Sequence, residues 1–316
     1  MFFDLAAFLL NILSLGTVAF FSGIFASSLL VSANTGLWSF TLAPARKQKL
    51  MWLTVSMPWA LAIASPVLLA LSLETIFPKL SDMMHWHHSN EFVINSWHIY
   101  PTILLILVFS FTFVKSCVLA ARHAQTFTHF RTFSDSEGLL DVREPNAFSA
   151  GLINPQTFIT KGLATKLDAS ELKIVQLHEL SHVKNRDSLK KLIFGFMSSF
   201  FPRSISKRLQ HEMAFSMELI ADSFVVSSGV SKFDIATTLL KVSKIISTYE
   251  RGQVEANIQC NFSGNEVKAR IENLLTQQPA STITNFSLYG SLILISLFCL
   301  LSLDTFHHLV ETFFHH

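Results

Sequence analysis

Four long apolar segments constrain this chain more than any other feature of its sequence. They run from Leu5 to Ser32, from Leu50 to Leu73, from Ile99 to Leu119 and from Ile283 to Leu303. A helix of about 20 apolar residues crosses a bilayer core of roughly 30 Å, so each segment is long enough to span a membrane. Half of all residues are hydrophobic and only 15% are charged, which argues against an ordinary soluble domain. We therefore predict a mainly α-helical membrane protein with four transmembrane helices.

The distribution of Lys and Arg predicts which side of the membrane each loop faces, because cytoplasmic loops are enriched in both residues. Three basic residues lie at 46–49, between the first two apolar segments, and Arg122 and Arg131 follow the third. The 74–98 loop has one basic residue, and the 304–316 tail has none. This asymmetry predicts an N-terminus outside the cell and a cytoplasmic location for the large segment between the third and fourth spans.

These two patterns predict the domain organisation. Residues 1–120 are expected to contain three spans, at about 5–32, 50–73 and 99–119. A cytoplasmic domain at 121–282, a fourth span at 283–303 and a short outer tail at 304–316 are expected to follow. The protein is therefore expected to be a multi-pass protein of the inner (cytoplasmic) cell membrane, in contact with lipid. The formal net charge of +2 gives no indication of direct nucleic-acid binding.

The expected cytoplasmic domain contains the HExxH motif His178-Glu179-Leu180-Ser181-His182. On a helix, positions 178 and 182 are one turn apart, so both imidazoles can bind one metal ion. A surface helix with two incidental histidines is the alternative. The context favours a true helix, because Asp168 or Ser170 can cap its start and nothing interrupts it before Phe201-Pro202. The motif therefore predicts a catalytic Zn²⁺ site, with Glu179 placed to take a proton from a water molecule.

A catalytic zinc needs a third protein ligand, and the best candidate is Glu218 in the segment Met217–Asp222. Asp222 lies one helical turn after Glu218, so it can accept a hydrogen bond from a ligand histidine. Two carboxylates on a mostly apolar helix require such a reason, since buried charge is costly. Glu212 and His211 are the rival third ligands.

Asp187 lies shortly after the HExxH motif and is a further candidate for supporting the metal site. It could order the end of the zinc helix, or it could form an ordinary surface ion pair with Arg186. Arg208 and His211 are weak candidates for stabilising the oxyanion of a hydrolytic reaction.

These motifs together resemble the BlaR/MecR family of integral-membrane metallopeptidases, over about residues 95–305. The likeness is carried by the HExxH segment with Lys184–Asp187, by Glu218–Asp222, by Ala147–Thr160 and by Lys268–Ile271. It implies a bacterial protein with a cytoplasmic α+β domain of gluzincin-like fold and a zinc bound by two His and one Glu. It also implies signal transduction, in which a cytoplasmic regulator such as a transcriptional repressor is cleaved. The signalling members carry a large penicillin-binding domain after the fourth span, and 304–316 contains no such domain, so the resemblance does not extend to β-lactam sensing.

The segment 147–153 is a candidate for binding the protein substrate. An exposed strand edge there could add a substrate strand through Phe148, Ser149, Ala150 and Gly151. The alternative is an ordinary half-buried hairpin.

Two other functions stay open at this point. One is a membrane quality-control protease of the HtpX type, which also pairs HExxH with a later ExxxD; three spans before the motif, rather than two, argue against it. The other is a non-proteolytic membrane receptor or scaffold with a residual metal site.

Small residues such as Gly23 and Ser27 allow helix association, so an oligomer is possible. Histidines in the predicted outer segments could bind metal or respond to pH, or they could be tolerated interfacial residues: His85, His87, His88, His98, His307, His308, His315 and His316.

Overall fold

The first two apolar segments form a helical hairpin in the computed structural model, which describes residues 2–33, 43–70, 99–136, 138–253, 261–276 and 290. Helix α1 spans Phe2–Ala33 and α2 spans Pro44–Ala70. They pack closely because a Cβ atom on Gly23 would lie only 2.9 Å from Cα of Pro58. Ser27, one turn further, is fully buried. Gly23 thus allows α1 to pack closely against α2 within one chain.

Three helices in the described part of the chain are long and apolar enough to cross a membrane, at Ile12–Ser32, Pro44–Val67 and Thr102–Phe133. The third belongs to α4, Ile99–Phe133, which continues well past the expected end of that span at Leu119. No Gly or Pro occurs between 120 and 133, so nothing stops the helix there. The expected domain boundary at 120 therefore falls inside α4. Apart from Gly290, the expected fourth span lies outside the described residues, and so do the eight histidines named above.

A small sheet follows α4. Strands β1 (Leu139–Leu140), β2 (Ala147–Ala150) and β3 (Gln156–Thr160) lie in the order β1-β3-β2. The expected strand pair is the antiparallel pair of β2 and β3, with Phe148 opposite Phe158. This order leaves β2 as an edge strand among the described residues.

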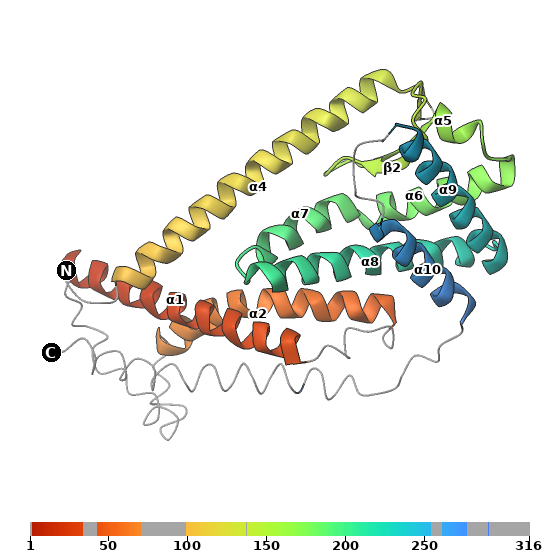
Figure 1. Ribbon diagram of the computed structural model, residues 1–316. Helices are drawn as coiled ribbons and strands as arrows, with labels where there is room; N and C mark the ends of the chain where they lie inside the picture. Colours follow the sequence, from red (N-terminus) through yellow and green to blue (C-terminus); the bar gives the residue numbers. More distant parts are fainter. Residues whose placement is uncertain are drawn as a thin grey trace.

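Six helices complete the described structure (Figure 1). They are α5 (Lys161–Ala164), α6 (Ala169–Asn185), α7 (Asp187–Ser198), α8 (Arg203–Ser227), α9 (Lys232–Gln253) and α10 (Asn261–Leu275). The sheet, α6, α9 and the C-terminal half of α8 lie together at one end of the molecule, and α4 reaches this end from the apolar helices (Figure 1). The described residues thus combine helices that are long and apolar enough to cross a membrane with a domain of helices and a small sheet.

The zinc-motif helix is shorter than the sequence predicted. It begins with a capping box, in which Asp168 accepts from the Ser170 and Glu171 backbone amides and Glu171 accepts from that of Asp168. It does not continue toward Phe201, because Arg186 adopts a left-handed conformation with φ of 52° and ends α6. Helix α7 then starts at Asp187, and this break turns Asp187 back toward α6.

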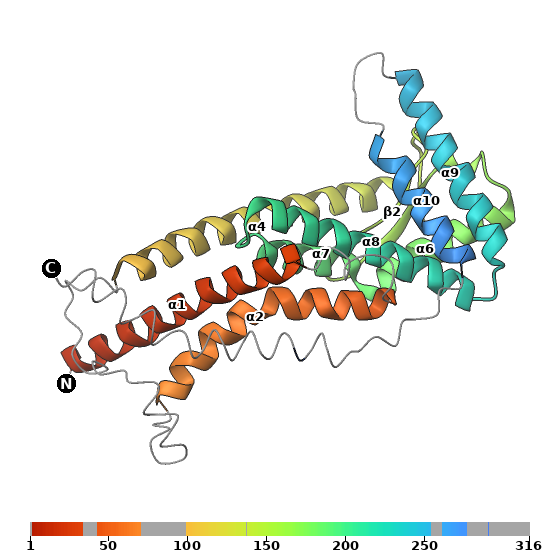
Figure 2. The ribbon, with the colours of Figure 1, turned by 60° about the horizontal axis from the view of Figure 1, so that its bottom comes forward.

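The apolar helices and the zinc-motif domain share one hydrophobic core. Buried residues of α1 and α2, such as Phe20 and Met51, form a cluster with Phe194 of α7 and Met213 of α8. Figures 1 and 2 both show α8 beside α2. The short apolar run 192–201, expected either in a core or against the membrane, packs through Phe194 and Phe201 in this core. Helix α8 therefore links the apolar helices to the site described below.

A buried ion pair between Lys47 of α2 and Glu212 of α8 leads to a stability prediction. Lys47 retains 6% of its side-chain exposure and Glu212 retains 23%. Replacing Lys47 with Met should leave Glu212 without a counter-charge, at a cost of about 1–3 kcal/mol. Thermal unfolding in detergent should show a clearly lower midpoint for Lys47→Met. The exposed Lys49→Met on the same helix should unfold like the wild type, and equal midpoints for the two variants would contradict a structural role for the pair.

Candidate metal centre

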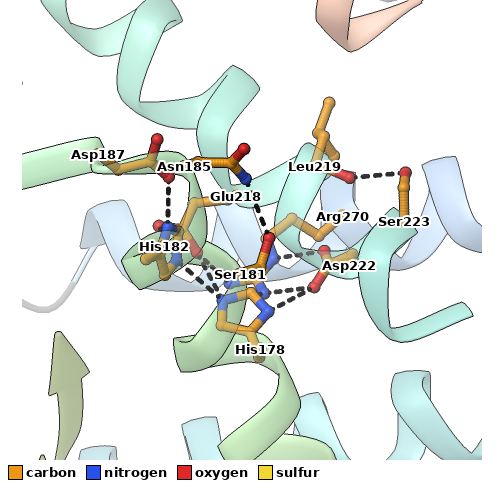
Figure 3. Close-up of polar contacts among 10 residues, drawn as sticks. All are labelled: His178, Ser181, His182, Asn185, Asp187, Glu218, Leu219, Asp222, Ser223 and Arg270. Atoms are coloured by element: carbon orange, nitrogen blue, oxygen red, sulfur yellow. Dashed lines mark hydrogen bonds and ion pairs between the residues drawn. The ribbon is translucent and has the colours of Figure 1, made fainter. Parts of the chain in front are cut away.

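The two histidines of the HExxH motif point toward one another from the same face of α6. Their Nε2 atoms lie 3.3 Å apart, as expected for residues one turn apart on a helix. His182 is buried and His178 is nearly so, with 13% of its side chain exposed. Glu218 extends from α8 toward both rings (Figure 3). One carboxylate oxygen lies 3.2 Å from Nε2 of His178, and the other lies 3.6 Å from Nε2 of His182.

These three side chains have the spacing that a zinc ion requires. Zinc–nitrogen and zinc–oxygen bonds of about 2.0–2.2 Å at tetrahedral angles put neighbouring ligand atoms roughly 3.3–3.5 Å apart. The 3.3 Å between the two Nε2 atoms and the 3.2 Å from Nε2 of His178 to one Glu218 oxygen agree with that value, and the other Glu218 oxygen lies 3.6 Å from Nε2 of His182. Two imidazoles and one carboxylate are also a ligand set that zinc uses in hydrolytic enzymes. The residues present therefore fit a zinc ion with one coordination position left for water or substrate.

The two rival third ligands have other partners. Glu212 pairs with Lys47 of α2. Nδ1 of His211 lies 3.4 Å from Glu266 of α10, and half of the His211 side chain is exposed. Neither residue lines the cavity around the histidines. Of the three candidates, the structure brings only Glu218 to the histidine pair.

Two further carboxylates hold the outer nitrogens of the histidine rings (Figure 3). Oδ1 of Asp222 lies 3.1 Å from Nδ1 of His178, and Oδ2 of Asp187 lies 2.7 Å from Nδ1 of His182. Such partners fix the ring orientation and leave Nε2 free for a metal. Asp222 therefore lies where the sequence-based hypothesis required it. Asp187 is 4% exposed, so it is not in the surface ion pair weighed as its alternative.

Arg270 of α10 is a member of this cluster for which the sequence predicted no role. Its guanidinium forms a two-pronged contact with Asp222, at 2.7 and 2.9 Å. It also lies 3.1 Å from Glu218 and 3.4 Å from Nε2 of His178. Only 12% of its side chain is exposed, so it offsets the charge of two carboxylates in a poorly hydrated site.

The electrostatics of the cluster favour charged side chains despite their burial. Burial opposes ionisation, but hydrogen bonds to Asp222 and Glu218 outweigh it and raise the pKa of His178 to about 9. Burial likewise opposes ionisation of Glu218, yet the His178 hydrogen bond and the charge of Arg270 hold the Glu218 pKa below its usual value. The pKa of Asp222 is lowered against its burial by the hydrogen bonds from Arg270 and His178. In the metal-free protein His178 is thus protonated, and its imidazolium pairs with the carboxylates of Asp222 and Glu218.

The raised pKa of His178 predicts that zinc binding releases a proton. Zinc binds neutral imidazole, so below pH 9 the ion must displace the proton on His178. We expect the apparent zinc affinity to fall about tenfold per pH unit as pH drops from 9 to 7. The ion pairs of this imidazolium stabilise the metal-free protein fully below pH 6.5, and that contribution is lost as pH rises through 9. Chelator competition at several pH values measures the slope, and a pH-independent affinity between 7 and 9 would contradict the assignment.

Glu179 has the environment of a proton acceptor. It is 8% exposed, and burial raises the pKa of its carboxyl above the ordinary value. It directly follows His178 on α6 and lines the same cavity. A carboxylate with a pKa raised toward neutrality both accepts and returns a proton near physiological pH.

A cavity of about 340 Å³ surrounds these groups. Ala147, Phe148 and Ser149 of β2 line it, whereas Ala150 and Gly151 do not. Gly151 instead ends the strand with φ of 107°, where a Cβ atom would lie 2.9 Å from the Asn154 carbonyl oxygen. The strand edge next to the histidines is therefore shorter than the segment expected from the sequence.

The two weak candidates for oxyanion stabilisation lie away from the cavity. Arg208 donates to the Val31 backbone carbonyl of α1, and His211 faces Glu266. Among the described basic residues, Arg270 and Lys191 line the cavity.

Comparison with known proteins relates the middle of the chain to one peptidase family. Residues 116–249 match the model of peptidase family M48. A protease HtpX homolog of Methanopyrus kandleri is 30% identical over 138 residues, which are 43% of each chain. Protease HtpX homolog 2 of Methanosarcina mazei is 47% identical over 63 residues, which are 19% of this chain and 21% of the relative. The chain thus matches less than half the length of these curated relatives. No solved structure matches the chain.

The matched segment contains α6 and α8, which supply all three candidate ligands. The part of the chain that is similar to peptidase family M48 is thus the part that contains the candidate metal ligands.

Proposed function

We propose that this protein is a membrane zinc endopeptidase with one catalytic Zn²⁺ on His178, His182 and Glu218. The proposal is carried by the clustering of these three side chains, whose ligand atoms lie within 4.8 Å of one another, beside a cavity that the buried Glu179 also lines. A zinc ion held by these residues would supply Lewis-acid chemistry to a water molecule and to a peptide carbonyl. The two imidazoles are held with Nε2 toward the ion by Asp222 and Asp187.

Glu179 performs the proton transfers of the reaction. Its carboxylate takes the proton of the attacking water and later donates it to the leaving amine nitrogen, so that the carboxylate is regenerated. Burial raises the pKa of its carboxyl, and a raised pKa favours the return of the proton to the leaving nitrogen. Arg270 keeps Asp222 oriented and limits the repulsion between Asp222 and Glu218.

The edge of β2 holds the substrate backbone. Ala147, Phe148 and Ser149 line the cavity, and β3 occupies only one side of β2 among the described residues. An extended peptide can therefore pair with the free edge and pass beside Glu179. This places a substrate carbonyl in the part of the cavity that the ligands surround.

The substrate class follows from the likeness to HtpX homologs and from the shared core of the domain and the apolar helices. A peptidase domain packed directly on membrane helices is suited to cut membrane proteins near the bilayer surface, as in quality control. The second candidate is cleavage of a cytoplasmic regulator such as a repressor, as in BlaR/MecR-type signalling. Three candidate spans lie before the zinc motif, and this arrangement favours the second candidate.

We further propose a multi-pass location in the cytoplasmic membrane, with the N-terminus outside and the peptidase domain inside. Basic residues at the start of α2 and in the last third of α4 support this orientation. Cysteine accessibility in intact cells tests it, because a cysteine introduced at Lys166 should be labelled only after the membrane is permeabilised.

Reconstituted protein distinguishes the candidate functions. Full-length protein in liposomes is loaded with zinc and given a folded membrane protein, its unfolded form and a folded soluble regulator. Chelator-sensitive cleavage of the unfolded membrane protein supports quality control, and a single cut in the folded regulator supports signalling. Zinc binding without any chelator-sensitive cleavage would instead indicate a receptor or scaffold.

A further inference from the structure

The cavity at the metal centre has two chemically different halves. One half is polar and contains the ligands, Glu179 and Arg270. The other half is apolar, and its side chains come from three helices. They are Ile174, Val175, Val225, Ile235, Leu239, Val242 and Ile246.

Helix α9 forms one wall of the apolar half. Ile235, Leu239, Val242 and Ile246 are spaced at four, three and four residues, so they lie on one face of the helix. Thr238 is the polar residue of this wall, and its hydroxyl already donates to the Asp234 carbonyl oxygen at 2.7 Å. The wall thus presents methyl groups to the cavity.

The apolar half begins directly beside the reacting groups. Ile174 and Val175 precede His178 by four and three residues, which places them about one helical turn, or roughly 5 Å, along α6. Strand β2 lies on the cavity as well, through Phe148. A peptide held on β2 with its carbonyl at the metal ligands would direct a neighbouring side chain toward Val175 and α9.

The burial of the α9 residues fits a binding surface better than a closed core. Val225 and Ile235, at the base, are 0% and 1% exposed and belong to a hydrophobic cluster. Leu239, Val242 and Ile246 are only half-buried, although they face the same cavity. A side chain entering the cavity would remove these residues from water.

We propose that this apolar half is a specificity pocket that accepts one bulky apolar side chain, such as Leu, Met or Phe, next to the scissile bond. The inference rests on the proposed peptidase function and names the sequences that it cuts. Burial of such a side chain should favour it over Ala or Ser by about 10- to 100-fold in kcat/KM.

Cleavage of a peptide library by the zinc-loaded full-length protein tests this pocket. Cut sites are identified by mass spectrometry for the wild type and for three variants of adjacent leucines on α9. Leu239→Trp fills the pocket and should shift the preference toward Ala and Ser, whereas Leu239→Ala enlarges it and should favour Phe and Trp. Leu240 is 54% exposed and does not line the cavity, so Leu240→Trp should keep the wild-type preference.

The possible results test the specificity pocket separately from the proposed peptidase function. Glu179-dependent cleavage with no apolar preference, or with a preference unchanged in both Leu239 variants, overturns the pocket and leaves the peptidase standing. Absence of any Glu179-dependent cleavage overturns the peptidase and the pocket with it. The two Leu239 variants change volume in opposite directions, so misfolding of one does not prevent a decision.

Discussion

Replacing Glu179 with Gln is expected to abolish peptide hydrolysis while zinc stays bound at one ion per chain. Gln has nearly the same shape but cannot accept the proton of the attacking water, and loss of such a base costs about 10²- to 10⁴-fold in rate. Zinc should remain because Glu179 is not among the three side chains whose ligand atoms cluster. Substrate cleavage on gels and zinc content by mass spectrometry measure the two effects separately.

A matched control is the exposed Glu272→Gln on α10, which should leave both the rate and the zinc content unchanged. The Glu179→Gln protein should also retain bound substrate, which makes it suitable for trapping the physiological target in the membrane. Full activity of Glu179→Gln would exclude the assigned role, and loss of zinc would show that the residue supports the metal instead.

The ligand positions could be predicted from sequence because helix geometry restricts them strongly. Glu212 precedes Glu218 by six residues, so it points to a different side of α8, toward Lys47. His211 precedes Glu218 by seven residues and is about two turns, or roughly 10 Å, away along the axis. Because Glu218 and Asp222 lie one turn apart, they share one face of α8. Helix periodicity therefore favours this pair over Glu212 and His211 as the side chains that face α6.

Other features depend on tertiary structure that periodicity does not contain. Arg270 lies 92 residues after His178, and its pairing with Asp222 requires α10 to pack against α8. In the sequence, Arg270 belonged to the segment Lys268–Ile271, which carries part of the family resemblance but indicated no role for this residue. The break at Arg186 was also missed, because a left-handed Arg carries no sequence signature comparable to Gly or Pro. The break at Arg186 nevertheless sets the position of Asp187. Asp187 is buried there and pairs with His182, whereas a surface acid would be exposed.

The membrane helices illustrate the same limit. Apolar length identified three candidate spans that the structure describes. Length could not show that Phe194 and Met213 of the domain share a core with α1 and α2, since that depends on how α7 and α8 pack. The domain that contains the HExxH motif is therefore expected to lose stability when it is separated from α1 and α2.

The second large effect is expected for Glu218→Ala, which should remove zinc as well as activity. One of the three clustered ligand atoms is lost, and Arg270 then keeps its positive charge beside two histidines with Asp222 as its remaining carboxylate partner. Changes to the outer partners of metal ligands already cost 10- to 100-fold in affinity, so loss of a direct ligand should cost about 100-fold or more. Chelator competition measures this affinity.

Glu212→Ala is the control that makes this result specific, because it removes a carboxylate from the same helix and is a rival ligand by sequence. It should destabilise the contact with Lys47 and still bind zinc at wild-type affinity. Asp222→Asn should fall between the two, since it weakens the support of His178 but removes no ligand. A reversed order, with zinc lost in Glu212→Ala and kept in Glu218→Ala, would move the third ligand to Glu212 and require α8 to rotate relative to α6.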